Sequence, residues 1–283
     1  MLQPQVPLRR PTTNARVLVL RDGPPTERPD RLATEEPMEI RAHGPGQEPV
    51  SVSVTMRTPG HDFELAVGFL FTEGLIGGKG DVAGVAYCED VPSDEQHYNI
   101  VTVALTRPFD GSALRRNFYA TSSCGICGKA SLEHVSVTCA PLGPGPLVPR
   151  SAIAAMPDAL RASQRVFEET GGLHAAGLFT VEGEPVLVRE DVGRHNAVDK
   201  LVGRSVLDAT VPLTNRILFV SGRVSFEIVQ KAAVAGIPLV AAVSAPSSLA
   251  VEAASALGMT VAGFVRGRGF NVYAHPERVA PQG

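Results

Sequence analysis

A pair of cysteines near the middle of the chain carries the most reactive chemistry in the sequence. Cys124 and Cys127 are two residues apart, and a glycine follows each of them. A helix is expected directly behind the pair, over residues 129–137. A thiol near a helix N-terminus and a cation such as Lys129 has a lowered pKa, which favours the thiolate. Lys129 could equally be a solvated helix residue. The pair can therefore bind a metal ion, cycle as a dithiol or carry sulfur.

Structural zinc is the first of these alternatives. A single Cys-x-x-Cys supplies half of a tetrahedral site. The other cysteines, Cys88 and Cys139, have no partner at ligand spacing, and His134 lies seven residues beyond Cys127. The sequence offers no complete zinc ligand set, so zinc stays an alternative without support from spacing.

Two further chemistries fit the surroundings of the pair poorly. A thioredoxin-like motif follows the first strand of a βαβ unit, but here the α/β pattern comes after the cysteines. A zinc deaminase needs His-x-Glu upstream of Pro-Cys-x-x-Cys. The sequence has no His-x-Glu, and Ser123 stands in place of the proline. Sulfur transfer is the fourth alternative. It needs an accessible thiolate on a mobile segment, and a second thiol nearby could assist release or exchange.

The amino-acid composition limits the kinds of partner and the cellular compartment that we expect for this protein. The net charge of −3 predicts no global attraction to nucleic acid or to an acidic membrane. No run of about 18 apolar residues predicts a membrane span, and the N-terminal residues lack an apolar signal core. Four cysteines without such a signal fit a reducing cytoplasm, where thiols are more often reactive or metal-binding than paired. We therefore expect a cytoplasmic protein.

The first half of the chain shows strand periodicity. Residues 50–56 alternate strictly between apolar and polar, and residues 15–21, 35–40, 82–87, 98–105 and 115–121 are also expected as strands. One helix is expected over residues 63–72, with Asp62 as its cap. The pattern predicts a small β-rich α+β domain over residues 15–140 that ends in the cysteine loop. A proline- and glycine-rich linker follows at residues 141–149.

The second half alternates strands with helices of about a dozen residues. Strands are expected at 174–180, 185–189, 217–220, 238–243, 260–265 and 271–273, and helices at 157–170, 195–207, 225–235 and 247–257. This order predicts an α/β domain over residues 150–283 with a mainly parallel sheet and helices on both faces. Such sheets bind ligands beyond the carboxyl ends of their strands.

Three segments with small or polar residues fall at that edge. Residues 190–196, 221–225 and 244–248 each follow a strand and open a helix, where free backbone N–H groups favour anions. Arg194 and Arg223 add positive charge. One such loop is an ordinary cap or turn, but three of them with two arginines predict a phosphate-bearing ligand. The run from Phe264 to Gly269 is a fourth, weaker candidate. The sequence has no Walker loop and no Gly-x-Gly-x-x-Gly dinucleotide fingerprint.

These motifs together resemble the formate dehydrogenase accessory sulfurtransferases, the FdhD family, over about residues 15–279. The matching segments are Glu36-Pro37 with Ile40, residues 56–70, Cys124 to Lys129, Thr170 to Ala176, Glu190 to Lys200, Ser221 to Arg223 with Ser225 to Glu227, and Ala245 to Ala250. No motif position departs from the family pattern.

The resemblance implies a sulfurtransferase that takes sulfur from a cysteine desulfurase through a persulfide on Cys124, with Cys127 as its partner. It implies delivery to the bis-molybdopterin guanine dinucleotide form of the molybdenum cofactor, which formate dehydrogenase requires. It also implies a homodimer and a second half like the cytidine-deaminase fold without its zinc site, with no metal ligands. The alternative is a zinc-stabilised chaperone for the same cofactor without covalent sulfur transfer, and a simple thiol oxidoreductase is a third possibility.

The resemblance also assigns a cofactor-binding run, and the helix-opening loops extend it to guanine nucleotide phosphates. The residues expected to bind are His174, Arg194, His195, Ser221, Arg223, Ser247, Phe264, Val265, Arg266, Gly267, Arg268 and Gly269. His174 and His195 either bind phosphate or guanine, or are satisfied, partly buried histidines that orient a loop. Asp191 and Asp199 are expected to orient a loop and a helix rather than to catalyse.

Overall fold

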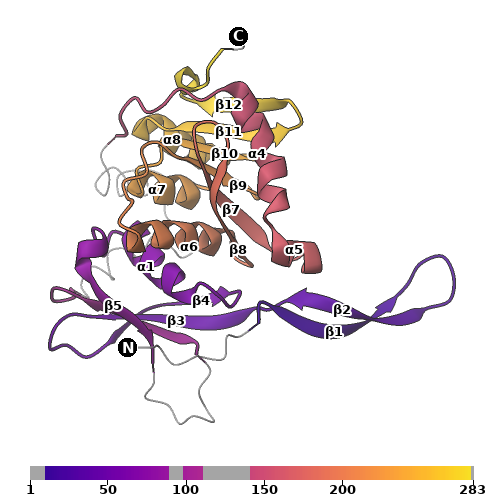
Figure 1. Ribbon diagram of the computed structural model, residues 1–283, viewed down its shortest axis with the longest axis horizontal. Coiled ribbons are helices and arrows are strands. Elements are labelled where there is room, and N and C mark those ends of the chain that lie inside the picture. Colours follow the sequence, from indigo (N-terminus) through magenta and orange to yellow (C-terminus); the bar gives the residue numbers. More distant parts are fainter. Residues whose placement is uncertain (1–9, 89–97, 111–140, 282–283) are drawn as a thin grey trace.

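The computed structural model describes residues 10–88, 98–110 and 141–281. This part of the chain forms three sheets (Figure 1). The cysteine pair, together with the strand expected at 115–121 and the helix expected at 129–137, lies outside the described residues. No helix of the described residues is long and apolar enough to cross a membrane.

The first sheet is a long hairpin that projects from the rest of the molecule (Figure 1). Its strands are β1 (Thr12–Val19) and β2 (Thr26–Ala33), which pair antiparallel over their whole length. The sequence indicated the first strand but not the second. Strand β2 has the polar sequence TERPDRLA, so it shows no alternation that would have revealed it.

The second sheet is built from four strands in the order β4-β3-β6-β5. Its strands are β3 (Glu36–His43), β4 (Val50–Arg57), β5 (Val82–Tyr87) and β6 (Ile100–Leu105), and its helix is α1 (Asp62–Thr72). These elements follow the predicted positions. Asp62 is not the cap of α1, because His61 occupies that position in a left-handed conformation. The Asp62 carboxylate binds Arg57 instead.

The third sheet has six strands in the order β12-β11-β10-β9-β7-β8. They are β7 (His174–Phe179), β8 (Pro185–Asp191), β9 (Ile217–Val220), β10 (Leu239–Ala242), β11 (Thr260–Arg266) and β12 (Gly269–Ala274). The prediction of a mainly parallel sheet is wrong. Only β9, β10 and β11 are parallel, while β7, β8 and β12 run antiparallel to their neighbours. Two hairpins cause this, because short turns join β7 to β8 and β11 to β12.

Helices cover both faces of this sheet, as the alternating pattern predicted (Figure 1). They are α4 (Arg150–Ala162), α5 (Arg165–Thr170), α6 (Arg194–Leu207), α7 (Phe226–Val234) and α8 (Ser248–Leu257). Along β9, Ile217 and Phe219 belong to the core under α4, and Leu218 and Val220 to the core under α6 and α7. The described part is therefore a mixed α/β structure with a three-layer second half. Its likeness to the cytidine-deaminase fold stays a prediction.

The helix expected at 157–170 is two helices. Helix α4 begins seven residues earlier and contains Pro157, and α5 begins after a break at Ser163 and Gln164. Proline removes one helical hydrogen bond, but α4 continues through it because Ile153, Met156 and Leu160 lie fully inside the core. Tertiary packing outweighs the local cost.

The two larger sheets meet through the crossing of α1 and α6. A Cβ atom on Gly68 would lie within 1.8 Å of the Asp199 carbonyl oxygen, and one on Gly203 within 1.8 Å of the Glu64 carbonyl oxygen. Each helix thus has a glycine at the point where the backbone of the other helix crosses it. One buried cluster runs continuously from α1 and the four-stranded sheet to α6 and α7. The division into domains at 15–140 and 150–283 stays a prediction.

The crossing makes a direct prediction for stability. We expect Gly203→Ala to lower the free energy of unfolding by about 3 kcal/mol, because the new methyl group overlaps the α1 backbone. In an unobstructed helix the same change would be stabilising by about 1 kcal/mol. Gly80→Ala is the matched control, since a Cβ there meets nothing within 4 Å. Equal denaturant midpoints for the two variants would contradict the close crossing.

Candidate functional site

The carboxyl ends of the three parallel strands meet at one edge of the six-stranded sheet. The loop after β9 opens α7, and the loop after β10 opens α8. Strand β7 starts at this edge and β8 ends there, because His174 pairs with Asp191. Ser221, the first residue after β9, accepts a hydrogen bond through Oγ from the Ala175 backbone N–H at 2.8 Å. The antiparallel strands thus add their own residues to the edge.

The structure brings His174, Arg194 and Ser221 together, as predicted from the sequence. A Cβ on Gly222 would lie 3.3 Å from His174 Nδ1 and 3.9 Å from Arg194 Cδ, so His174 packs closely against this position and Arg194 lies beside it. Arg194 Nε is buried and has no hydrogen-bond partner among the described residues. An unsatisfied buried donor costs about 1–3 kcal/mol. The edge is therefore suited to an anionic ligand that supplies the missing acceptor.

Both histidines are shifted toward the neutral form. Burial, followed by the charge of Arg194, lowers the pKa of His195 to about 4, and the same two causes lower the pKa of His174. His195 Nε2 lies 3.0 Å from Ser225 Oγ and 3.7 Å from a Glu227 carboxylate oxygen. His195 is thus satisfied within the protein, whereas His174 faces the edge as a neutral hydrogen-bonding group. Ser225 and Glu227, which the resemblance had included only as motif residues, are the partners of His195.

The loops after β9 and β10 are tied to each other. Val224 forms an isolated parallel bridge with Pro246, and the Ser247 N–H donates to the Val224 carbonyl at 3.0 Å. Ser247 Oγ accepts from the Ala250 N–H at 3.3 Å and caps α8. Its hydroxyl is therefore already used by the helix, although its binding role stays a prediction. Arg223 lies exposed on the adjoining loop.

The run from Phe264 to Gly269 forms the end of β11, the turn and the start of β12. Phe264 has a positive φ of 55°, lies at a break in the β11–β12 register and is 41% exposed. Positive φ is strained for a bulky residue, and bulges re-aim side chains next to functional sites. The Phe264 N–H donates to the Ser244 carbonyl at 3.1 Å, which joins this run to the edge.

The individual members of this run differ in what they can offer a ligand. The Val265 side chain is fully buried in the core under α4, so only its backbone is open to a ligand, and its binding role stays a prediction. Side chains at this end of β11 alternate between the two faces of the sheet, and Val265 lies on the face that packs into the core. Arg266 and Arg268 are exposed. Gly267 and Arg268 line a separate cleft of about 630 Å³ with the N-terminal residues of α4.

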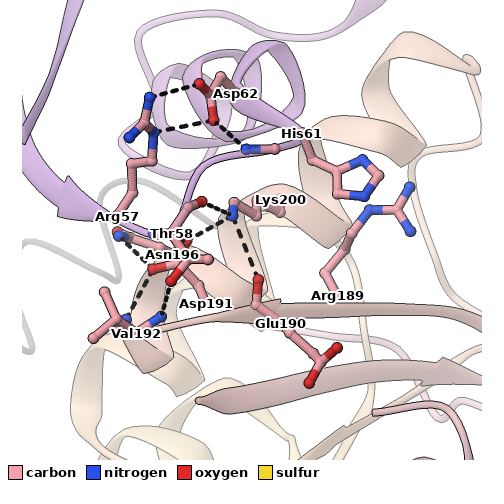
Figure 2. Close-up of polar contacts among 12 residues, drawn as sticks. Arg57, Thr58, His61, Asp62, Arg189, Glu190, Asp191, Val192, Asn196 and Lys200 are labelled. Carbon is pink, nitrogen blue, oxygen red and sulfur yellow. Dashed lines mark hydrogen bonds and ion pairs between the residues drawn. The ribbon is translucent and has the colours of Figure 1, made fainter. Parts of the chain in front are cut away.

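The buried Asp191 carboxylate positions the loop that leads into α6 (Figure 2). Arg194 and His195 are the first two residues of this helix. Asp191 is fully buried, and its Oδ2 lies 2.6 Å from Lys200 Nζ. It also accepts from the Thr58 N–H at 3.1 Å, the Gly193 N–H at 2.8 Å and Asn196 Nδ2 at 3.0 Å. The prediction that Asp191 orients a loop is confirmed. What sequence reasoning missed is that its partner Thr58 directly follows β4 of the other sheet.

Asp199 has the expected orienting role on the same helix. It accepts from Thr72 Oγ1 at 2.7 Å and lies 3.0 Å from Lys231 Nζ. Burial raises the pKa of Asp199, while the charges of Asp199 and Glu73 raise the pKa of Lys231 against its own burial. This cluster joins α1, α6 and α7, so it fixes the helices that begin at the candidate site.

Two arginine–carboxylate pairs hold α1 in place: one ties it to β4 of its own sheet, and the other ties it to β8 of the six-stranded sheet. Arg57 Nε and Nη2 donate to the two Asp62 oxygens at 3.1 and 2.9 Å, and Arg189 Nε and Nη2 donate to the two Glu64 oxygens at 2.5 and 2.8 Å. Burial by itself would raise the pKa of Glu64, but the hydrogen bonds and charges of Arg189 and His61 outweigh it and lower that pKa to about 2. Paired forks of this kind add geometric specificity to the contact.

The predicted catalytic pair, Cys124 and Cys127, lies outside the described residues. Cys88, which follows β5, is half-buried and is not a predicted site residue. Among the described residues, no three His, Cys, Asp or Glu side chains gather closely enough to hold a metal ion. The described residues thus form a candidate binding edge, and the reactive thiols remain a prediction from the sequence.

Comparison with known proteins adds an independent result. The model of the FdhD/NarQ family matches residues 33–280. A Streptomyces coelicolor protein named "Sulfur carrier protein FdhD" is 52% identical over 278 residues, which cover 96% of both chains. A Mycobacterium tuberculosis protein of the same name is 50% identical over 277 residues, which cover 95% of this chain and 98% of that one.

A solved structure agrees with these matches. The crystal structure of a Desulfotalea psychrophila protein assigned as a formate dehydrogenase accessory protein has a TM-score of 0.73 and 25% identity. The match covers 97% of this chain and all of that one. The chain belongs to the FdhD/NarQ family, as its motifs indicated.

The Glu64–Arg189 pair makes a prediction about pH. The pKa of Glu64 is about 2 in the folded protein and 4.5 as its ordinary value, so the unfolded chain takes up the proton first as pH falls. The pair therefore contributes stability on the order of 3 kcal/mol above pH 4.5, which is lost as pH falls toward 2. We expect Glu64→Gln to remove this part of the pH dependence in urea unfolding, whereas the exposed Glu27→Gln leaves it intact. An unaltered acid slope in Glu64→Gln would contradict the assignment.

Proposed function

We propose that this protein is a sulfur carrier that moves sulfur from a cysteine desulfurase to the bis-molybdopterin guanine dinucleotide cofactor needed by formate dehydrogenase. The Cys124-x-x-Cys127 pair, present in a chain of the FdhD/NarQ family, carries the proposal. The curated relatives named as sulfur carriers and the structural relative assigned as a formate dehydrogenase accessory protein support it. The proposal includes a cytoplasmic homodimer.

The proposed chemistry has two steps. The Cys124 thiolate attacks the outer sulfur of the desulfurase persulfide, the donor S–S bond breaks, and the desulfurase thiolate leaves. Cys124 then holds the outer sulfur as a persulfide. In the second step the Cys127 thiolate attacks the inner sulfur, which releases hydrosulfide toward the cofactor and leaves a Cys124–Cys127 disulfide. The two electrons that reduce the transferred sulfur to hydrosulfide come from the two cysteines, so an external dithiol must reduce their disulfide by thiol–disulfide exchange before another cycle.

The substrate's phosphates would bind at the edge of the six-stranded sheet. Three observations support this placement: the unpartnered Arg194 Nε, the neutral His174 beside it, and the tight approach at Gly222. A pyrophosphate group offers acceptors to both side chains and to the free N–H groups at the start of α6. The bulged Phe264 with Arg266 would contact the substrate next to this edge, in keeping with the cofactor-binding run that the resemblance implies.

Loading with sulfur tests the carrier role. After incubation with a cysteine desulfurase and cysteine, intact-protein mass spectrometry should show a gain of one sulfur atom that a reductant removes. Cys124→Ala should abolish the gain, and Cys88→Ala should retain it. An unchanged gain in Cys124→Ala would overturn the assignment. Stoichiometric zinc that is lost on Cys127→Ser, with no sulfur gain in the wild type, would favour the zinc-stabilised chaperone.

Nucleotide binding tests the proposed phosphate edge. Calorimetry should detect GDP binding, and Arg194→Met should weaken it by about 10- to 100-fold, because a charge-assisted hydrogen bond is worth about 1.5–3 kcal/mol. Arg204→Met is the matched control, since Arg204 lies at the other end of α6 and pairs with Asp208 at 2.7 Å. Equal GDP affinities of the two variants would contradict the placement of the phosphates at this edge.

A further inference from the structure

A cleft of about 590 Å³ opens beside the proposed phosphate edge, between α4, α5 and the start of β7. Its volume falls within the ~300–1,000 Å³ typical of small-molecule sites. The residues that matter for its chemistry are Leu160, Arg161, Gln164, Phe167, His174 and Ser221. His174 and Ser221 belong to the phosphate edge as well, so a ligand can extend from the cleft to Arg194.

Gln164 is the unexplained residue of this cleft. Its side chain is only 6% exposed, yet its amide has no hydrogen-bond partner among the described residues. Gln164 occupies the cap position of α5, but Glu190 from β8 takes over the capping by accepting from the Val166 and Phe167 N–H groups at 3.0 and 2.8 Å. The amide is therefore left free to pair with a molecule in the cleft that Gln164 lines.

The walls of the cleft suit a flat ring. The Arg161 guanidinium lies over the Phe167 ring at 4.3 Å from its centroid, which places two planar groups at the rim. Leu160, which is 2% exposed, contributes an apolar surface next to them. Aromatic rings and guanidinium planes are the surfaces on which heterocyclic bases stack.

The amide defines which polar edge the ring presents. Gln164 Oε1 can accept from a ring N–H while Nε2 donates to the adjacent ring carbonyl, a two-bond pairing that a neighbouring N–H and C=O satisfy together. Guanine and pterins share this pair of groups in their 2-amino-4-oxopyrimidine ring. The proposed substrate contains both ring systems.

We propose that the α4–α5 cleft holds a 2-amino-4-oxopyrimidine ring, guanine or pterin, with the Gln164 amide paired to its N–H and carbonyl edge. The inference rests on the proposed function for the identity of the substrate, and it adds a ring subsite with Gln164, Arg161 and Phe167 to the phosphate edge. The ring lies against Phe167, and the attached phosphates lead past His174 and Ser221.

The experiment compares affinities for GDP, 6-hydroxymethylpterin and inorganic pyrophosphate in full-length protein by calorimetry. Gln164→Met keeps the length of the side chain and removes both hydrogen-bonding groups. We expect it to weaken GDP, the pterin or both at least about tenfold, with pyrophosphate affinity unchanged and the thermal midpoint unchanged or higher. The ligand that weakens identifies the ring. Gln230→Met on α7, outside the cleft, is the control.

Phe167→Leu provides a second variant, and it should show the same ring-selective loss if Gln164→Met does not fold. Unchanged affinity for both ring ligands in the folded variants would overturn the inference, as would an equal loss for pyrophosphate. Wild-type protein that gains sulfur on Cys124 but binds neither ring would overturn the ring subsite and leave the carrier function standing. Ring binding that depends on Gln164, in a protein that gains no sulfur on Cys124, would support the ring subsite and overturn the carrier function.

Discussion

The buried ion pair of Asp191 and Lys200 is the interaction on which the candidate site depends. Both groups are out of contact with water, so the carboxylate must be satisfied by the protein on every side. Three N–H donors and one ammonium do this, and one of the donors, the Thr58 backbone, directly follows β4 of the four-stranded sheet. The loop before α6 therefore cannot take its shape unless the two sheets are docked. The geometry of the candidate site therefore depends on the packing between the two sheets.

The crossing of α1 and α6 brings the two sheets close enough for Thr58 to reach Asp191. Gly68 and Gly203 let the backbones approach, and the Lys231 cluster with Asp199 and Glu73 then ties α7 to both helices. Asp199 and Lys231 are buried, Glu73 is partly buried, and each charge has a partner, so the junction tolerates little relative movement. A rigid junction holds the donors of the site in place before an anion binds. The entropy cost of ordering them then does not reduce the binding free energy.

The edge itself differs from the junction in being incompletely satisfied. Arg194 Nε is buried without a partner, the Gln164 amide is freed by Glu190, and Phe264 holds a strained conformation. These three features lie in adjoining parts of one edge, whereas Arg278 Nε, the other buried side-chain donor without a partner among the described residues, lies beside Thr260 at the start of β11. Unsatisfied donors and backbone strain are retained where a ligand relieves them. The contrast between a saturated junction and an unsaturated edge supports the proposed function more strongly than any one residue does.

Local patterns were sufficient for the alternating strand 50–56, the helix after Thr58-Pro59-Gly60 and most elements of the second half, and the motifs identified the family. Short-range periodicity encodes these features, so reading them needs no knowledge of the fold. It could not reveal β2, whose polar residues pair only because β1 lies beside them, or the antiparallel strands, whose direction depends on the turns. The passage of α4 through Pro157, the burial of Val265 and the freeing of the Gln164 amide also depend on residues distant in sequence. The sequence thus determined which groups are available for chemistry, and the tertiary structure decided which of them are already satisfied and which are left for a ligand.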